Sequence, residues 1–193
     1  MTRPIVLASS SPYRQELLAR LRLPFVTDPP RIDEAALPGE AHGATAERLS
    51  LAKAQAVARR HPGAIVIGSD QVASLGDLAI GKPGSHDAAR RQLALMSGRT
   101  VSFHSGLALV DGNRQRSGCV RTDVTFRTLD DAQIEAYLRA DTPYDCAGSA
   151  KIELLGICLV QNVRSDDPTA LVGLPLIALT TLLGELGVRL PAG

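Results

Sequence analysis

The stretch "AIVIGSDQV" at residues 64–72 gives the clearest indication of the fold. Its first five residues are mostly apolar, which predicts a strand over residues 64–68 that is buried on both faces of a sheet. Gly68, Ser69 and Asp70 follow, so a carboxylate stands where the buried strand is expected to end. A structural carboxylate more often caps a helix or closes a turn, and no helical pattern begins here. Asp70 is therefore the first candidate for a functional residue.

The segments around this strand alternate between strand and helix patterns, which is typical of an α/β fold. Strands are expected at residues 4–8, 24–27, 100–110 and 116–127, and helices at 12–21, 45–60, 85–96, 128–140 and from Pro175 onward. The "DGN" between the two long strands indicates a hairpin, and Thr45 is expected to cap its helix. Thr128 and Asp131 resemble a capping box. We therefore expect a single domain over residues 1–193, with a mixed twisted sheet, flanking helices and two lobes around a cleft.

The composition argues against several classes of function. The net charge is +1, so nucleic acid is not an expected partner. Aromatic residues make up 3% and Trp is absent, which argues against a stacking surface for single strands. No run of about twenty apolar residues exists and the N-terminal run is too short for a signal peptide, so no membrane association is expected. Three cysteines without a CxxC pair indicate buried free thiols in a reducing compartment, which predicts a cytoplasmic protein.

The lysines are unusually few. Of 21 basic residues only Lys53, Lys82 and Lys151 are lysines, and the others are arginines. A lysine is a compact, flexible point charge that a planar guanidinium does not replace, so these three positions are candidates for binding phosphate. The alternatives are chance, and for Lys53 an ordinary place beside the apolar face of a helix. On a strand, Lys151 and Glu153 would face the same side.

A serine cluster, "SSS" at residues 9–11, lies between the first strand and the first helix. Ser9 and Ser11 offer hydroxyl groups, and the helix N-terminus offers free N–H groups, to an anion. Arg14 lies in the first helical turn and could bind the same anion with its bidentate fork. The alternative is an ordinary helix cap, and the Gly and Lys of a Walker A loop are missing.

Acidic residues complete a set that suits a polyphosphate and a divalent cation. Asp33 and Glu34 lie in a loop beside prolines, and Asp167 precedes the last helix. Taken singly, loop acids are usually solvated or close turns. Taken with Asp70, the lysines and the serine hydroxyls, they supply hard oxygen ligands for a cation, positive charge for phosphates, and an acceptor for the proton of a water.

Six stretches, in their order along the chain, resemble the Maf family of nucleoside triphosphate pyrophosphatases. They are "LASSSPYRQELL", "DE" at 33–34, "AKA" at 52–54, "GSDQV", "GKP" and "DDPTALVGLPL". Together they span nearly the whole chain. The resemblance implies a fold similar to that of inosine triphosphate pyrophosphatases. It also implies a divalent cation such as Mg, Mn or Co, and cleavage of a nucleoside triphosphate to the monophosphate and pyrophosphate.

Three positions bear on the choice of base. Family members that act on dTTP and UTP carry Arg where this chain has Tyr13, and "DT" where it has Asp70 and Gln71. Tyr13, Gln71 and Glu153 together resemble the subgroup that cleaves 7-methylguanosine triphosphate, although its members often carry Trp in place of Tyr13. An aromatic face attracts the cationic methylated guanine. The Glu153 carboxylate can accept hydrogen bonds from guanine N1–H and the exocyclic amine, with Gln71 as an amide partner. A UTP, dTTP or unmodified GTP pyrophosphatase is the alternative.

The resemblance also implies roles for the charged residues. Asp70 either takes the proton of the attacking water or holds the cation that acidifies it, and the resemblance favours the base role. Lys53 and Lys82 act on the triphosphate and Lys151 binds it. Glu34 helps Asp70 to hold the cation, with Asp33 as the alternative. The expected partner is a small nucleotide, and a homodimer is left open. A nucleotide-binding regulator of cell division without turnover is the alternative from another class, although such a binder has little need of Asp70.

Overall fold

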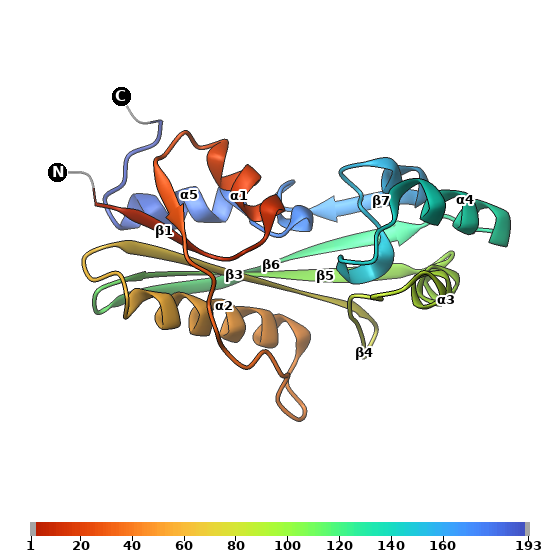
Figure 1. The fold of residues 1–193 in the computed structure, drawn as a ribbon, viewed down its shortest axis with the longest axis horizontal. Helices are drawn as coiled ribbons and strands as arrows, with labels where there is room; N and C mark the ends of the chain where they lie inside the picture. Colours follow the sequence, from red (N-terminus) through yellow and green to blue (C-terminus); the bar gives the residue numbers. More distant parts are fainter. Residues whose placement is uncertain (1–2, 192–193) are drawn as a thin grey trace. The chain divides into compact units, whose positions relative to one another are not determined.

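The computed structural model describes residues 3–191 (Figure 1). In chain order the elements are β1 (Ile5–Ala8), α1 (Pro12–Ala19), β2 (Phe25–Thr27), α2 (His42–Ala58), β3 (Ile65–Leu75), β4 (Leu78–Ile80), α3 (His86–Met96), β5 (Thr100–Asp111), β6 (Arg114–Phe126), α4 (Asp131–Asp141), the 3-10 turns η1 (Ala147–Ser149) and η2 (Leu155–Leu159), β7 (Val160–Ser165), η3 (Ala170–Val172) and α5 (Leu176–Glu185). No helix between residues 3 and 191 is long and apolar enough to cross a membrane.

The strands form one seven-stranded sheet with the order β2–β1–β3–β5–β6–β7, and β4 pairs with β3. β1 is parallel to both β2 and β3, whereas β3–β4 and β6–β7 are antiparallel. This confirms the expected α/β fold with a mixed sheet and flanking helices. The chain divides into two compact units, the first of residues 3–71, 104–120 and 167–191, the second of residues 72–103 and 121–166.

In the first unit the sheet is covered by helices on both faces (Figure 1). Alternate residues of a strand point to opposite faces. Ile5 and Leu7 accordingly pack with the apolar side chains of α1 and α5, and Val6 and Ala8 pack with those of α2. Because both faces are buried, these strands read in the sequence as continuous apolar runs rather than as alternating ones.

Two glycines let α2 lie directly on the sheet. A Cβ added to Gly68 of β3 would lie 2.1 Å from the carbonyl oxygen of Ser50, and one added to Gly106 of β5 would lie 2.2 Å from that of Ala46. Side chains at these two positions would push the helix away from the strands. This close approach brings Lys53, one turn beyond Ser50 on α2, to the residues that follow Gly68.

The buried strand is longer than the sequence indicates. The expected end at residue 68 is wrong, because β3 continues to Leu75 and Asp70 lies inside the strand. The physical reason is the segment that follows, which returns as β4 and pairs with the far end of β3, so that Ala73 lies opposite Ile80. A partner strand satisfies the backbone beyond the polar residues, and the strand therefore does not stop at them.

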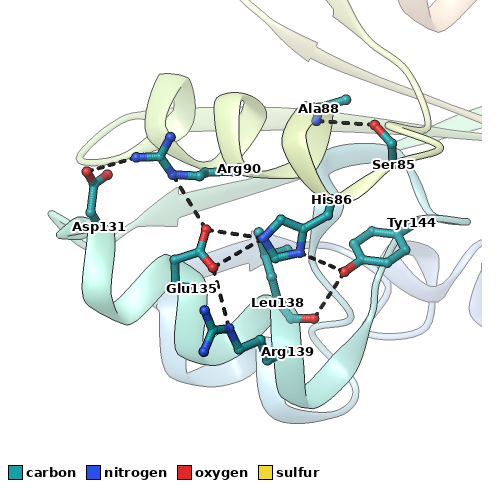
Figure 2. Close-up of polar contacts among 9 residues, drawn as sticks. All are labelled: Ser85, His86, Ala88, Arg90, Asp131, Glu135, Leu138, Arg139 and Tyr144. Atoms are coloured by element: carbon teal, nitrogen blue, oxygen red, sulfur yellow. Dashed lines mark hydrogen bonds and ion pairs between the residues drawn. The ribbon is translucent and has the colours of Figure 1, made fainter.

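In the second unit α3 and α4 pack against each other and are joined by polar contacts (Figure 2). His86 at the start of α3 lies 3.1 Å from Glu135 of α4 through Nε2, and 3.0 Å from the Tyr144 hydroxyl through Nδ1. Arg90 donates to Asp131 at 2.9 Å. These contacts fix the orientation of α3.

Several expected local features differ from the structure. Helix α2 begins at His42 without a side-chain cap, and Thr45 lies inside it, donating to the Glu40 carboxylate at 2.9 Å. The capping box of α4 uses Asp130 with Gln133 and not Thr128 with Asp131, because the helix begins at Asp131 and Asp130 is therefore its N-cap. The cysteines are free as expected, but Cys119 and Cys158 are exposed rather than buried.

Candidate functional site

Lys53, Asp70 and Glu34 form the centre of the candidate active site. Lys53 Nζ lies 2.5 Å from Asp70 Oδ1 and 3.0 Å from Glu34 Oε1. The Lys53 and Asp70 side chains are only 7% and 10% exposed, whereas Glu34 is 57% exposed. A buried lysine therefore holds two carboxylates, one fixed on the sheet and one on a loop that faces solvent. The structure thus brings together three residues that the sequence separates by up to 36 positions, from Glu34 to Asp70.

The loop that carries Glu34 is fastened to α2 by residues that sequence reasoning missed. Arg48 of α2 donates to both oxygens of Glu40 at 2.7 Å and to the Ala35 carbonyl at 3.0 Å. Hydrogen bonds from Arg48 lower the pKa of Glu40 to about 2, and Thr45 contributes less. Asp33 closes a turn by accepting from the Ala35 N–H at 3.0 Å. Glu40 and Arg48 lie eight positions apart across a helix start, a spacing that gives no local signal.

Arg14 lies on the first turn of α1 and belongs to the same charged group. Its Nε donates to the carbonyl of Gly173 at 2.9 Å. Burial lowers the pKa of the Arg14 guanidinium, and the negative charges of Asp70 and Glu34 raise it in part. Arginine stays protonated in proteins, so its charge is held near the two carboxylates. Its other N–H groups make no hydrogen bond with residues 3–191, and they are available to an anion.

The serine loop follows β1 directly beside this group. β1 and β3 are parallel with Ala8 opposite Gly68, so the chain after Ala8 leaves the sheet next to Asp70. Ser11 is the N-cap of α1, and its hydroxyl accepts from the Arg14 N–H at 3.4 Å. Ser9 is buried, and its hydroxyl accepts from the Ser11 N–H at 3.1 Å. The expected serine cluster thus also builds the start of the helix.

Tyr13 and Gln71 lie in the same unit. Tyr13 is partly exposed on the first turn of α1. Gln71 Nε2 donates to the Ser105 hydroxyl at 3.0 Å and to the carbonyls of Ala170 and Leu171 at 3.1 and 2.9 Å. Three acceptors around one nitrogen fix which way the amide points. The Gln71 carbonyl oxygen forms no hydrogen bond inside the described range and is left as an acceptor.

The turn at Gly173, before the last helix, contacts both α1 and β3. The Gly173 carbonyl accepts from Arg14 Nε and, at 2.8 Å, from the hydroxyl of Ser69, which is fully buried in β3. Gly173 has a φ of 109°, which favours glycine, and an added Cβ would lie 3.4 Å from Arg14 Nε. Asp167 is 2% exposed and accepts from the N–H groups of Ile177 and Ala178 at the start of α5. Asp167 therefore stabilises a helix and is not one of the carboxylates around Lys53.

Three candidate residues belong to the second unit. Lys82 is exposed in the turn between β4 and α3, and it forms no ion pair with any residue from 3 to 191. Lys151 lies 3.4 Å from Asp145 Oδ1, and its side chain is 13% exposed. Glu153 is exposed. The strand geometry considered for Lys151 and Glu153 is wrong, because residues 152–154 form a turn that leads into η2.

In the described residues, no group of three or more His, Cys, Asp or Glu side chains is placed to hold a metal ion. Asp70 and Glu34, which both approach the same ammonium, are the carboxylates that would hold one. With only two protein ligands, the remaining ligands would come from substrate phosphates and water, which is the usual pattern for Mg²⁺ at phosphate sites.

Comparisons with known proteins identify relatives of this chain. The family model described as Maf-like protein matches residues 4–186. A protein of Cupriavidus metallidurans named 7-methyl-GTP pyrophosphatase is 60% identical, over 96% of this chain and 95% of its own length. One of the same name from Bordetella pertussis is 58% identical, over 95% and 92%. Among solved structures, a HAM1 protein from Coxiella burnetii matches 65% of this chain and 73% of its own at 18% identity, with a TM-score of 0.47. The chain therefore belongs to the Maf family.

Proposed function

We propose that this chain hydrolyses 7-methylguanosine triphosphate to the monophosphate and pyrophosphate. The observation that carries the proposal is the buried ion pair of Lys53 and Asp70, with Glu34 on the same ammonium. The names of the Cupriavidus and Bordetella relatives support the choice of substrate, since both proteins are identical to this chain at more than half of the aligned positions. The proposal treats residues 1–193 as one catalytic domain.

Asp70 takes the proton of the attacking water. Its Oδ1 is occupied by Lys53, whereas its Oδ2 forms no hydrogen bond in the described range and is not among the buried unpartnered atoms. A water can therefore reach Oδ2. As the water oxygen bonds to phosphorus, its proton passes to Asp70, the bond between the α and β phosphates breaks, and pyrophosphate leaves with the electron pair. The rigid strand keeps the carboxylate in one place during this step.

Positive charge around Asp70 binds the triphosphate. Lys53 donates to Asp70 and lies 3.0 Å from a Glu34 oxygen, and its ammonium has further N–H groups for a phosphate oxygen. Arg14 offers its outer N–H groups, and Ser9 and Ser11 offer hydroxyls. Lys82 and Lys151 of the second unit are proposed separately as lysines that bind phosphate. Because the phosphates are common to all nucleotides, these residues contribute to affinity and turnover but not to the choice of base.

The two carboxylates fit a divalent cation. Asp70 and Glu34 supply hard oxygen ligands and already gather one positive charge between them, the Lys53 ammonium. A bound Mg, Mn or Co ion would offset the charge of the phosphates and lower the pKa of a bound water. Glu34 lies on an exposed loop and can adjust to the ion, whereas Asp70 is fixed.

Tyr13, Gln71 and Glu153 select the base. Gln71 Nε2 donates to three acceptors, which leaves its carbonyl oxygen to accept from a donor edge such as guanine N1–H and the exocyclic amine. Glu153 is exposed, and its carboxylate is proposed to accept from guanine and to repel the carbonyl oxygens of uracil. The methyl group at N7 gives the ring a positive charge, which the face of Tyr13 attracts.

The experiment is a substrate panel. Pyrophosphate release is measured with 7-methylguanosine triphosphate, GTP, UTP and dTTP in the presence of a divalent cation, and kcat/KM is compared. The proposal predicts the highest kcat/KM for the methylated nucleotide. A preference for UTP or dTTP would overturn the substrate, and nucleotide binding without pyrophosphate release would favour the regulator.

A further inference from the structure

Gln92 of α3 lies between the two loops that carry Lys82 and Lys151. Its Nε2 donates to the carbonyl of Gly81 at 3.0 Å, and its Oε1 accepts from the Ser149 hydroxyl at 2.5 Å. One amide thus joins Gly81, the residue before Lys82, to Ser149, two residues before Lys151. We infer that Gln92 is a positioning residue that holds both lysines for the triphosphate. The inference rests on the proposed function and adds to it a residue without any charge.

The helix that carries Gln92 is firmly fixed within the second unit. The Ser85 hydroxyl caps α3 by accepting from the Ala88 N–H, and His86 and Arg90 contact Glu135 and Asp131 of α4 (Figure 2). α3 also packs against η1, which contains Ser149. A side chain on such a rigid helix can hold two loops in fixed positions through its hydrogen bonds.

The loop before Lys151 needs this support because its backbone is strained. Ser149 has a φ of 52°, an uncommon value for a residue with a side chain, and it is fully buried. Burial leaves its hydroxyl dependent on a protein partner, and Gln92 supplies one. The Lys151 N–H donates to the buried Tyr137 hydroxyl at 2.9 Å, so the loop is held on both sides of Ala150.

The turn that carries Lys82 is held in the same manner. Gln92 binds the Gly81 carbonyl on one side of Lys82, and the Gly84 N–H donates to the Tyr144 carbonyl at 3.0 Å on the other. Lys82 itself is exposed and, within residues 3–191, without an ion pair. A fixed backbone with a free ammonium lowers the entropy lost when phosphate binds. Loss of Gln92 would leave both lysines present but their backbones less ordered.

The test replaces Gln92 with methionine, which has a similar length but cannot make either hydrogen bond. Loss of two hydrogen bonds is expected to weaken binding of inorganic triphosphate about tenfold, measured by calorimetry. The kcat/KM for every nucleotide should fall by a similar factor. Gln133→Met is the control, since it makes the same change in the same unit. It breaks the capping box of α4, and the hydrogen bonds of Gln133 are to Asp130 and not to either lysine loop.

A double-mutant cycle separates positioning from general destabilisation. In a Lys82→Ala, Lys151→Ala background, Gln92→Met should cause no further loss of triphosphate binding, whereas Gln133→Met should have the same effect in both backgrounds. An equal loss from Gln92→Met in both backgrounds, or unchanged binding in the single variant, would overturn the inference. Binding of inorganic triphosphate is read without turnover. A wild type that binds it but cleaves no nucleotide would therefore refute the proposed function and leave this inference to be decided by the cycle.

Discussion

Lys53 Nζ lies 2.5 Å from Asp70 Oδ1, and the two side chains are almost completely buried between α2 and β3. This contact depends on Gly68, whose missing side chain lets the helix approach the strand. Both charges are costly to remove from water. Removing one partner therefore destabilises the fold, because it leaves the other charge buried without compensation. The same contact therefore governs both stability and chemistry.

Lys53→Met should lower the free energy of unfolding at pH 7 by about 3 kcal/mol, because it leaves the Asp70 carboxylate buried without its ammonium. The value lies at the low end for buried pairs, since Arg14 still acts on Asp70. Urea unfolding followed by circular dichroism measures the change. The double variant Lys53→Met, Asp70→Asn should regain most of the stability. A single variant as stable as wild type would contradict the burial of this pair.

Gly68→Ala should displace α2, because the new Cβ would lie 2.1 Å from the Ser50 carbonyl oxygen. We expect a loss of about 1–3 kcal/mol in the free energy of unfolding and a loss of turnover as Lys53 moves from Asp70. Gly184→Ala is the matched control, since nothing lies within 4 Å of its added Cβ and it is inside α5. The control should be neutral or stabilising. Equal effects of the two variants would contradict the close packing of α2.

Acid stability tests the fastening of the Glu34 loop. Arg48 lowers the pKa of Glu40 from 4.5 to about 2, so Glu40 stabilises the folded state above pH 4.5 and loses this contribution as the pH falls toward 2. Glu40→Gln should therefore be less stable than wild type at neutral pH, and the difference should shrink between pH 4.5 and 2. Chemical unfolding across this range measures it. Glu16→Gln, at an exposed position without an ion pair among residues 3–191, should show no such narrowing.

Tyr13→Ala should reduce kcat/KM for 7-methylguanosine triphosphate more than for GTP. A cation–π contact of about 0.5–2 kcal/mol corresponds to a change of roughly 2- to 30-fold in the ratio of the two values. Tyr13→Phe, which keeps the aromatic face, should preserve the ratio. A ratio that is the same in wild type and Tyr13→Ala would remove Tyr13 from the base site.

The parts of the fold that depend on local sequence could be predicted. β1 and β2, the β5–β6 hairpin and the Ser85 cap of α3 follow from apolar runs, a turn with glycine and a helix-start signal within a few residues. Asp70 and Lys53 could be selected by residue type, since one is a carboxylate beside a buried apolar run and the other is one of three lysines.

Features that depend on distant segments could not be predicted. The length of β3 is set by its pairing with β4, and the orientation of the Gln71 amide by carbonyls 99 and 100 positions away. The role of Asp167 depends on a helix that begins nine positions later and turns back onto its carboxylate. No periodicity in a single segment encodes such contacts, because they form only when the elements have packed.

The most direct test of the central claim is the turnover of Asp70→Asn. The amide keeps the shape of the side chain and can still contact Lys53, but it cannot take a proton from water. We expect kcat with 7-methylguanosine triphosphate to fall about 100-fold or more, with a circular dichroism spectrum like that of wild type. A folded Asp70→Asn protein that releases pyrophosphate at close to the wild-type rate would contradict the assignment of Asp70 as the residue that accepts the proton.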